Sequence, residues 1–314
     1  MGSKALGLIL MAILPTQIWA QDPLVNATDF EGRQAWFHLE QLVSFGERYT
    51  GSPGNEQAKN YMRSVFQNCQ GQLRESHGTM EVEGTEPVKI ENIWFQFAPE
   101  VKENRLLLGT HFDTRPWPDR EEDESLHRVR GVIGACDGGS GTAILLELAS
   151  VLSEKNANIP VDIVVFDAEE PLPKEFIPKG YFLGSRKFVF DRVKEGTLSQ
   201  YSSVLVIDVV GGKNAQVGLD QSSIARAPRW SAKIQNAIEK LDLPSLRLPA
   251  NYSIWDDHTA FQNAGVPAAL MIDYDYPYLD TLKDTLDKCD PQAVKEVGQT
   301  VLQVVIDHGK SASR

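Results

Sequence analysis

The sequence predicts an α/β fold in which a largely parallel sheet is covered by helices on both faces. Short, nearly continuous apolar runs, typical of strands buried on both sides, occupy residues 105–108, 161–166, 204–210 and 266–272. Helical stretches lie between and after these runs, at residues 141–152, 185–193, 228–241 and 291–308. This alternation of strands and helices indicates the α/β class with three layers.

The part of the chain before the first of these runs adds two helices and one strand. Residues 32–42 and 55–67 have helical patterns, and the Gly51-Ser-Pro-Gly54 break separates them. Residues 88–97 alternate in polarity and are rich in Ile, Trp and Phe, which predicts a strand. Because no internal repeat or long linker interrupts the chain, we expect one domain over residues 21–314.

The composition excludes some classes of partner. The chain of 314 residues is 42% hydrophobic and 24% charged, which is close to the average for globular proteins. It has 43 acidic and 31 basic side chains, for a net charge of -12. Nucleic acid is therefore not an expected partner, because its phosphates attract basic surfaces. The acidic segment 119–124 is expected to be solvated surface.

Residues 1–20 are expected to be a secretory signal peptide. Lys4 supplies a positive start, residues 5–14 form an apolar run, and Ile18-Trp-Ala20 has the form of a cleavage site. No other stretch is long and apolar enough to cross a bilayer. We therefore expect a secreted or periplasmic protein without a membrane span after signal cleavage. The cysteines, which permit at most one disulfide, are Cys69, Cys136 and Cys289.

Acids and histidines gather where predicted strands end and helices begin. This is the edge at which open α/β sheets bind their ligands. The residues concerned are His111, Asp113, Asp137, Glu169, Glu170, Asp208, Asp256, Asp257 and His258.

These groups together predict a metal site. A single acid at such a place is usually a helix cap, as Asp137 would be. Asp208, however, lies within a buried run, where a carboxylate is costly unless it is paired or metal-bound. The adjacent Glu169 and Glu170 repel each other and attract a cation. Carboxylates with one or two histidines suit zinc, and they also suit magnesium, calcium or manganese. If Glu170 binds the ion, the neighbouring Glu169 is free to transfer a proton.

The same residues stand in motifs that resemble a known superfamily, the zinc aminopeptidases and glutaminyl cyclases, over roughly residues 40–308. The motifs are His111-x-Asp113, Gly134-Ala-Cys-Asp137, Phe166-Asp-Ala-Glu-Glu170, Gly184-Ser-Arg186, Val206-Ile-Asp208 and Asp256-Asp-His258. Two longer stretches, 111–119 and 273–278, are similar to bacterial members of the glutaminyl-peptide cyclotransferase branch.

The resemblance implies a mixed, mostly parallel sheet of the zinc exopeptidase kind. It also implies one zinc ion, held by Asp137, Glu170 and a residue late in the chain. Glu169 matches the general acid and base, and Asp208 and Asp256 match acids that form hydrogen bonds around it. The implied reaction converts an N-terminal glutamine of a peptide or protein into pyroglutamate and releases ammonia. The oligomeric state is not indicated.

The chain departs from the family pattern at the late ligand. The family has a histidine there, preceded by an aromatic residue, whereas the matching positions hold Asp280 and Leu279. The pocket tryptophan expected soon after the Glu169-Glu170 pair is also missing near residues 175–176.

Three interpretations of the metal site follow. Asp280 ligates the ion in an all-carboxylate site, or the site binds metal poorly and the protein is a catalytically impaired binding relative, or His111 and its neighbours hold the ion. A further alternative is a zinc-dependent aminopeptidase with two metals, for which the second-metal candidates are His111 and Asp208.

Overall fold

The computed structural model describes residues 25–84, 86–127, 129–171, 180–247 and 252–312. The predicted signal peptide and the segment 172–179, which follows the Glu169-Glu170 pair, lie outside the described residues. Within them, no helix combines the length and the hydropathy that crossing a membrane requires. The three cysteines are present as free thiols.

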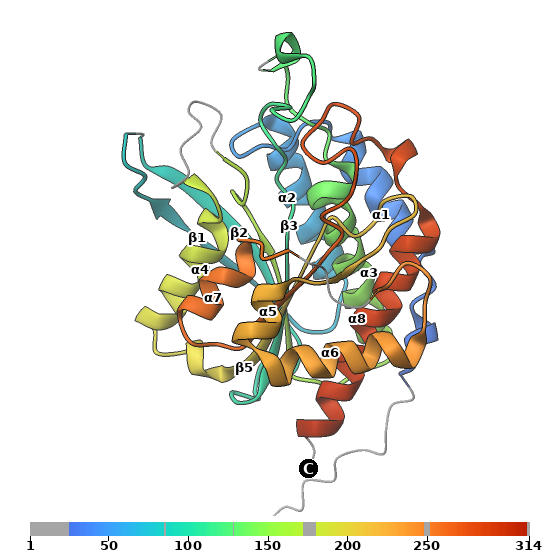
Figure 1. The fold of residues 1–314 in the computed structure, drawn as a ribbon. Coiled ribbons are helices and arrows are strands. Elements are labelled where there is room, and N and C mark those ends of the chain that lie inside the picture. The colour runs from blue at the N-terminus through green and yellow to red at the C-terminus, as the bar shows by residue number, and fades with distance from the viewer. Residues whose placement is uncertain (1–24, 85, 128, 172–179, 248–251, 313–314) are drawn as a thin grey trace, which may run out of the picture.

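A mixed sheet of seven strands forms the centre of the molecule (Figure 1). Its spatial order is β1-β2-β4-β3-β5-β7-β6, and the neighbours β4, β3, β5 and β7 are parallel. Antiparallel strands complete both edges. The strands span Gln72–Met80 (β1), Val88–Gln96 (β2), Arg105–His111 (β3), Val161–Phe166 (β4), Tyr201–Asp208 (β5), Gly218–Leu219 (β6) and Ala268–Ile272 (β7).

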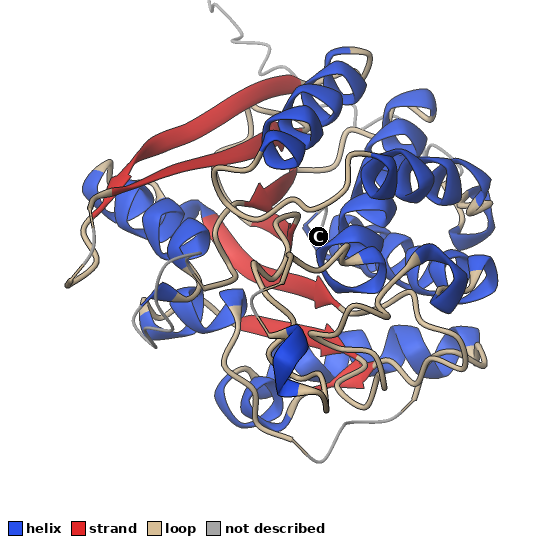
Figure 2. Ribbon diagram, turned by 90° about the horizontal axis from the view of Figure 1, so that it is seen from above, coloured by secondary structure: helices blue, strands red, loops and turns tan. Residues whose placement is uncertain are grey.

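Helices cover both faces of this sheet, as Figure 2 shows. One face packs against α2 (Pro53–Gln67) and α3 (Gly141–Glu154), and α1 (Arg33–Ser44) and α8 (Pro291–Ala312) pack against α3 on the same side. The other face packs against α4 (Leu183–Lys194) and α7 (Asp257–Asn263). Helices α5 (Gln221–Arg226) and α6 (Pro228–Leu241) pack against each other and against β7, and α6 also contacts α8. The predicted three-layer α/β fold is confirmed.

The predicted elements are present with shifts of a few residues at their ends, and the missed elements are short or exposed. The four central strands are buried along almost their whole length, which explains their continuous apolar runs. Strand β1, which the sequence analysis missed, is an edge strand that is mostly exposed. An exposed strand has no apolar face to bury, so its sequence carries no strand pattern.

Candidate metal centre and active site

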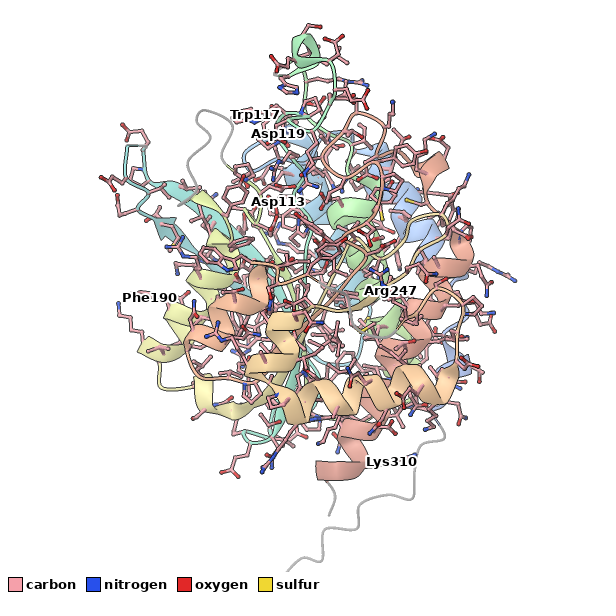
Figure 3. The ribbon with its side chains drawn as sticks, in the orientation of Figure 1. Asp113, Trp117, Asp119, Phe190, Arg247 and Lys310 are labelled. Atoms are coloured by element: carbon pink, nitrogen blue, oxygen red, sulfur yellow. The ribbon has the colours of Figure 1, made fainter. Side chains whose placement is uncertain are left out.

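The predicted site residues meet above the carboxyl ends of the parallel strands. His111 and Asp208 end β3 and β5, Glu169 and Glu170 follow β4, and Asp256 precedes α7. A cavity of about 610 Å³ opens there. The predicted site residues that line it are Asp137, Glu169, Glu170, Asp208, Asp256 and Asp280. In Figure 3, Asp113 and Asp119 lie toward this upper end of the molecule, and Lys310 lies at the opposite end.

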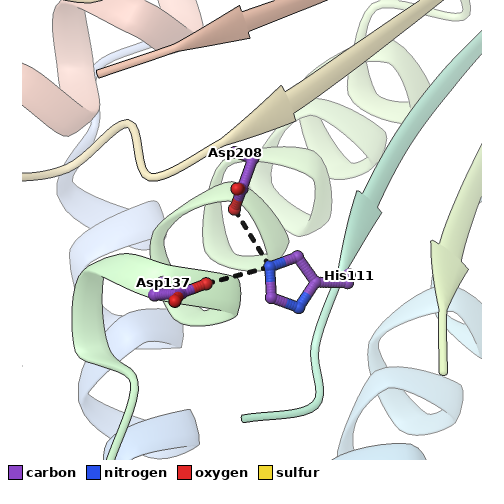
Figure 4. Close-up of side chains that lie close together, drawn as sticks. All are labelled: His111, Asp137 and Asp208. Carbon is purple, nitrogen blue, oxygen red and sulfur yellow. Dashed lines mark hydrogen bonds and ion pairs between the residues drawn. The ribbon is translucent and has the colours of Figure 1, made fainter. Parts of the chain in front are cut away.

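Two groups of potential metal ligands share Asp137. In the first group, His111 Nε2 lies 3.0 Å from Asp137 Oδ1 and 3.0 Å from Asp208 Oδ1 (Figure 4). In the second group, ligand oxygens of Asp137, Glu170 and Asp280 lie within 4.8 Å of one another. Asp280 therefore lies beside Asp137 and Glu170, and its role as a metal ligand stays a prediction.

Imidazole nitrogen and carboxylate oxygen are ligands that zinc and other divalent ions accept. The donor atoms of both groups fit such an ion, and the nitrogen of His111 makes the first group the more typical of zinc.

Two arginines neutralise part of the negative charge of the second ligand group. The sequence analysis did not predict this role. Arg115 Nη1 lies 2.5 Å from Glu170 Oε2, and its Nε lies 3.5 Å from Asp280 Oδ1. Arg120 Nε lies 3.0 Å from Asp280 Oδ2. The expectation that segment 119–124 is only solvated surface is therefore wrong for its first half, which packs against the Asp280 loop. Glu121 also contributes there, since its Oε1 accepts the backbone N–H of Leu282 (2.8 Å).

Backbone hydrogen bonds to two buried acids fix the ligand loops. Asp113 accepts the N–H groups of Glu169 and Glu170, both at 3.1 Å. Asp284 accepts the N–H group of Cys136 at 2.9 Å and that of Asp137 at 3.1 Å. These two carboxylates thus set the direction in which the ligand side chains point.

A fully buried arginine, Arg48, ties two of the loops together. Its guanidinium donates to the carbonyl oxygens of Phe112 (2.9 Å), Ile133 (2.9 Å) and Gly134 (2.8 Å). It thereby connects the end of β3 to the loop that carries Asp137. Nothing in the sequence around Arg48 indicated this role.

Strained backbone also marks the site. Ala168, Val209 and Asp280 have φ values of 54°, 48° and 57°, in the left-handed region that side chains with a Cβ rarely adopt. Each is a site residue or the neighbour of one. Gly138, with φ of 73°, is required because a Cβ there would lie 2.6 Å from the carbonyl oxygen of Asp113. Strain of this kind persists only where the surrounding structure enforces it.

Burial controls the protonation of the site. Desolvation, together with the nearby Glu170, Asp256 and Asp257, raises the pKa of Glu169 well above its usual value, although His111 opposes the shift. Burial disfavours the charged form of His111, but Asp208 and Glu169 outweigh it and raise the pKa of His111 well above its usual value. The site therefore contains a carboxyl that holds a proton easily beside an imidazole that does the same.

His258 is the one predicted member that does not join the site. Its Nε2 lies 3.0 Å from Ser222 Oγ and 3.7 Å from Asp220 Oδ1, on the side of α5. Burial lowers the pKa of His258 to about 4, so the ring is neutral and serves packing between α5 and α7. Its neighbour Asp257 is fully buried and lies close enough to Glu169 to raise the pKa of that carboxyl group.

The chain is similar in sequence to a family of peptidases and to glutaminyl-peptide cyclotransferases. The model of peptidase family M28 matches residues 92–305. A glutaminyl-peptide cyclotransferase from Gloydius blomhoffii is 23% identical, over 83% of this chain and 77% of the relative.

The similar solved structures include a glutaminyl cyclase and an aminopeptidase precursor. The glutaminyl cyclase of Tannerella forsythia superposes with a TM-score of 0.79 at 29% identity, covering 88% of this chain and 98% of that one. A leucine aminopeptidase precursor from Bacteroides thetaiotaomicron has a TM-score of 0.82 at 27% identity, covering 90% and 99%. The resemblance inferred from the motifs is confirmed.

The buried carboxylates predict a loss of stability as the pH rises. Burial raises the pKa values of Asp167, Asp257, Asp280 and Asp284 to about 7. The folded chain then binds more protons than the unfolded chain between roughly pH 4 and 7, so stability falls as these protons leave. His38 and His258, with pKa values lowered to about 4, act in the opposite sense, but only below about pH 6.5.

Because the last of these protons leave as the pH passes the folded pKa of about 7, we expect the thermal midpoint of the chelator-treated protein to be lower at pH 8 than at pH 6.5. A saturating divalent ion should raise the midpoint more at pH 8 than at pH 6.5, because the ion replaces the missing protons. A midpoint that stays level or rises over this interval without metal would contradict the assigned pKa shifts.

Proposed function

Because the chain belongs to peptidase family M28, we propose that it acts on the N-termini of peptides or proteins and converts N-terminal glutamine into pyroglutamate. The observation that carries the proposal is Glu169. Its carboxyl group is buried at the cavity, its pKa is raised, and it stands next to the potential ligand Glu170. A carboxyl whose pKa is raised takes up a proton more readily than an ordinary one, which suits a group that first accepts and then donates a proton. The curated cyclotransferase relatives, which align over most of the chain, support the same reaction.

The reaction needs one proton to travel between two nitrogens. The α-amine of the glutamine attacks the carbon of its own γ-amide, a C–N bond forms, and the original amide C–N bond breaks. Glu169 accepts the proton that the amine loses and donates it to the departing nitrogen, which leaves as ammonia. Asp208 and Asp256, which line the same cavity, are proposed to form hydrogen bonds that orient the reacting groups.

A divalent ion, for which zinc is the proposed identity, would be held by Asp137, Glu170 and Asp280. When bound there, such an ion would supply positive charge to polarise the amide carbonyl and to stabilise the negative charge that develops on the carbonyl oxygen. The chain's own contribution is to place three carboxylates around one point and to keep Glu169 unligated beside them.

A second candidate function, metal-dependent aminopeptidase, is favoured by the shared position of Asp137. His111 and Asp208 provide, with Asp137, a second set of donor atoms close to the first. Two adjacent metals suit the attack of water on a peptide bond. The two functions differ in the attacking group, so their products distinguish them.

The third alternative, a binding relative with little activity, is favoured by the arginines. Arg115 and Arg120 pair with Glu170 and Asp280, so the all-carboxylate group is already partly neutralised. An ion has to displace or share these contacts. We also propose that residues 1–20 direct the chain to secretion or to the periplasm.

The first test replaces Glu169 with Gln. If Glu169 transfers the proton, E169Q lowers kcat for cyclisation of a glutamine-initiated peptide by about 10²–10⁴-fold. Ammonia release and the matching mass loss of the peptide measure this reaction. E239Q, which alters an exposed glutamate on α6, is the matched control and should keep full activity. If the unmodified chain releases free N-terminal amino acids instead of ammonia, the aminopeptidase is supported. If the unmodified chain shows neither reaction, the binding relative is the remaining interpretation.

The second test replaces Asp280 with His. An imidazole at a ligand position should raise the affinity for zinc by about tenfold or more, because zinc favours nitrogen ligands and the substitution releases Arg120. Competition against a chromogenic chelator measures this affinity without reference to activity. D287H, an exposed position in the same loop, is the control. Equal zinc affinity for D280H and the original chain would place residue 280 outside the ligand set.

A further inference from the structure

A second cavity of about 610 Å³ lies at the amino ends of the parallel strands, on the side of the sheet opposite to the first cavity along the strand direction. Its lining includes Asn104, Ser202 and Pro267, which lie at the amino ends of β3, β5 and β7. The active-site cavity lies at the carboxyl ends of these strands, so the two cavities are about 20 Å apart for strands of this length. This second cavity, called the basal cavity here, shares no residue with the first.

Three cations surround the basal cavity. Arg226, Arg229 and Lys233 line it, and none of the ion pairs among the described residues involves any of them. Arg226 is held instead by a neutral partner, since its Nη2 donates to Asn263 Oδ1 at 2.9 Å. In a chain with a net charge of -12, three uncompensated cations around one cavity form a local positive field.

The start of α6 adds to this field. Arg229 and Lys233 lie four residues apart, on the same side of the first turns of this helix of 14 residues. The residue before the helix is Ala227, whose side chain caps no N–H group. The partial positive charge of the helix start therefore has the same sign as the two side chains.

The lining of the cavity combines apolar side chains with polar ones, and the rings of Trp230 and His308 are part of it. Trp230 and His308 are 5% and 6% exposed, and their rings pack edge to face with centroids 6.5 Å apart. His308 makes its hydrogen bond through Nε2, to the carbonyl oxygen of Asn104 at 2.8 Å. Burial, together with Lys233, keeps the pKa of His308 below its usual value. The ring is thus neutral with its proton on Nε2, and Nδ1 is left as an acceptor.

We propose that the basal cavity binds a small organic acid that carries a hydroxyl or N–H group on an apolar body. The acid group sits among Arg226, Arg229 and Lys233, where the cations neutralise it. The apolar body packs on Pro228, Trp230 and Pro267, and the hydrogen-bond donor reaches His308 Nδ1. This site is independent of the proposed cyclisation, because it uses none of the residues at the carboxyl edge.

Calorimetric titration of the full chain with three related probes tests the proposal. The probes are 4-hydroxyphenylacetate, phenylacetate, which lacks the hydroxyl, and 4-hydroxyphenylacetamide, which lacks the charge. We expect the first to bind, the second to bind about three- to tenfold more weakly, and the third to bind at least about tenfold more weakly. Equal binding of the amide and the acid, or no binding of either acid, would overturn the proposal.

Charge reversal locates the binding. The double variant R229E/K233E should lose at least about tenfold in affinity for 4-hydroxyphenylacetate. The control R33E/K213E reverses two exposed cations elsewhere and should bind as the original chain does. Circular dichroism and unfolding midpoints check that both variants fold. Equal losses in the two variants would show an effect of net charge alone and would contradict a specific basal site.

Discussion

The concentration of buried carboxylates at the carboxyl ends of the central strands is the constraint on which the rest of the structure depends. Desolvation penalises each charged carboxylate, and their mutual repulsion adds to the cost. The chain offsets this cost with the imidazole of His111, with the guanidinium groups of Arg48 and Arg115, and with protons. A divalent ion would neutralise the same charge more completely. The residues involved are Asp113, Asp137, Glu169, Glu170, Asp208, Asp256, Asp257, Asp280 and Asp284.

The fold supplies the rigidity that such a cluster requires. Central parallel strands end at one edge, and buried backbone hydrogen bonds to Asp113 and Asp284 hold the loops that follow. Left-handed φ values at Ala168 and Val209 show that packing, rather than local preference, sets these loops. The cavity at the amino ends of the strands is lined by Arg226, Arg229 and Lys233, whereas six carboxylates line the cavity at the carboxyl ends. The two cavities therefore suit different ligands.

The sequence predicted the central fold and most of the acids that lie together at one cavity, because both depend on local signals. Apolar runs marked the buried strands, and the acids directly after them marked the site. Strand β1 carried no such signal, since its side chains are mostly exposed. The roles of Arg48, Arg115 and Arg120 depend on contacts between residues far apart in the chain, for example the 55 residues that separate Arg115 from Glu170. Asp257 and His258 are neighbours at the start of α7, but His258 points to α5, because one residue along a helix turns the side chain by about 100°.

The metal content of the purified protein tests the central claim most directly. If the acidic edge is a cation site, elemental analysis by mass spectrometry should find about one divalent ion per chain, most simply zinc. The variant D137N, which removes the ligand common to both groups, should lose that ion while its fold is kept. A second ion per chain would favour the aminopeptidase arrangement. Protein that is folded but metal-free, and that takes up neither zinc nor manganese nor magnesium at saturating concentration, would contradict the account.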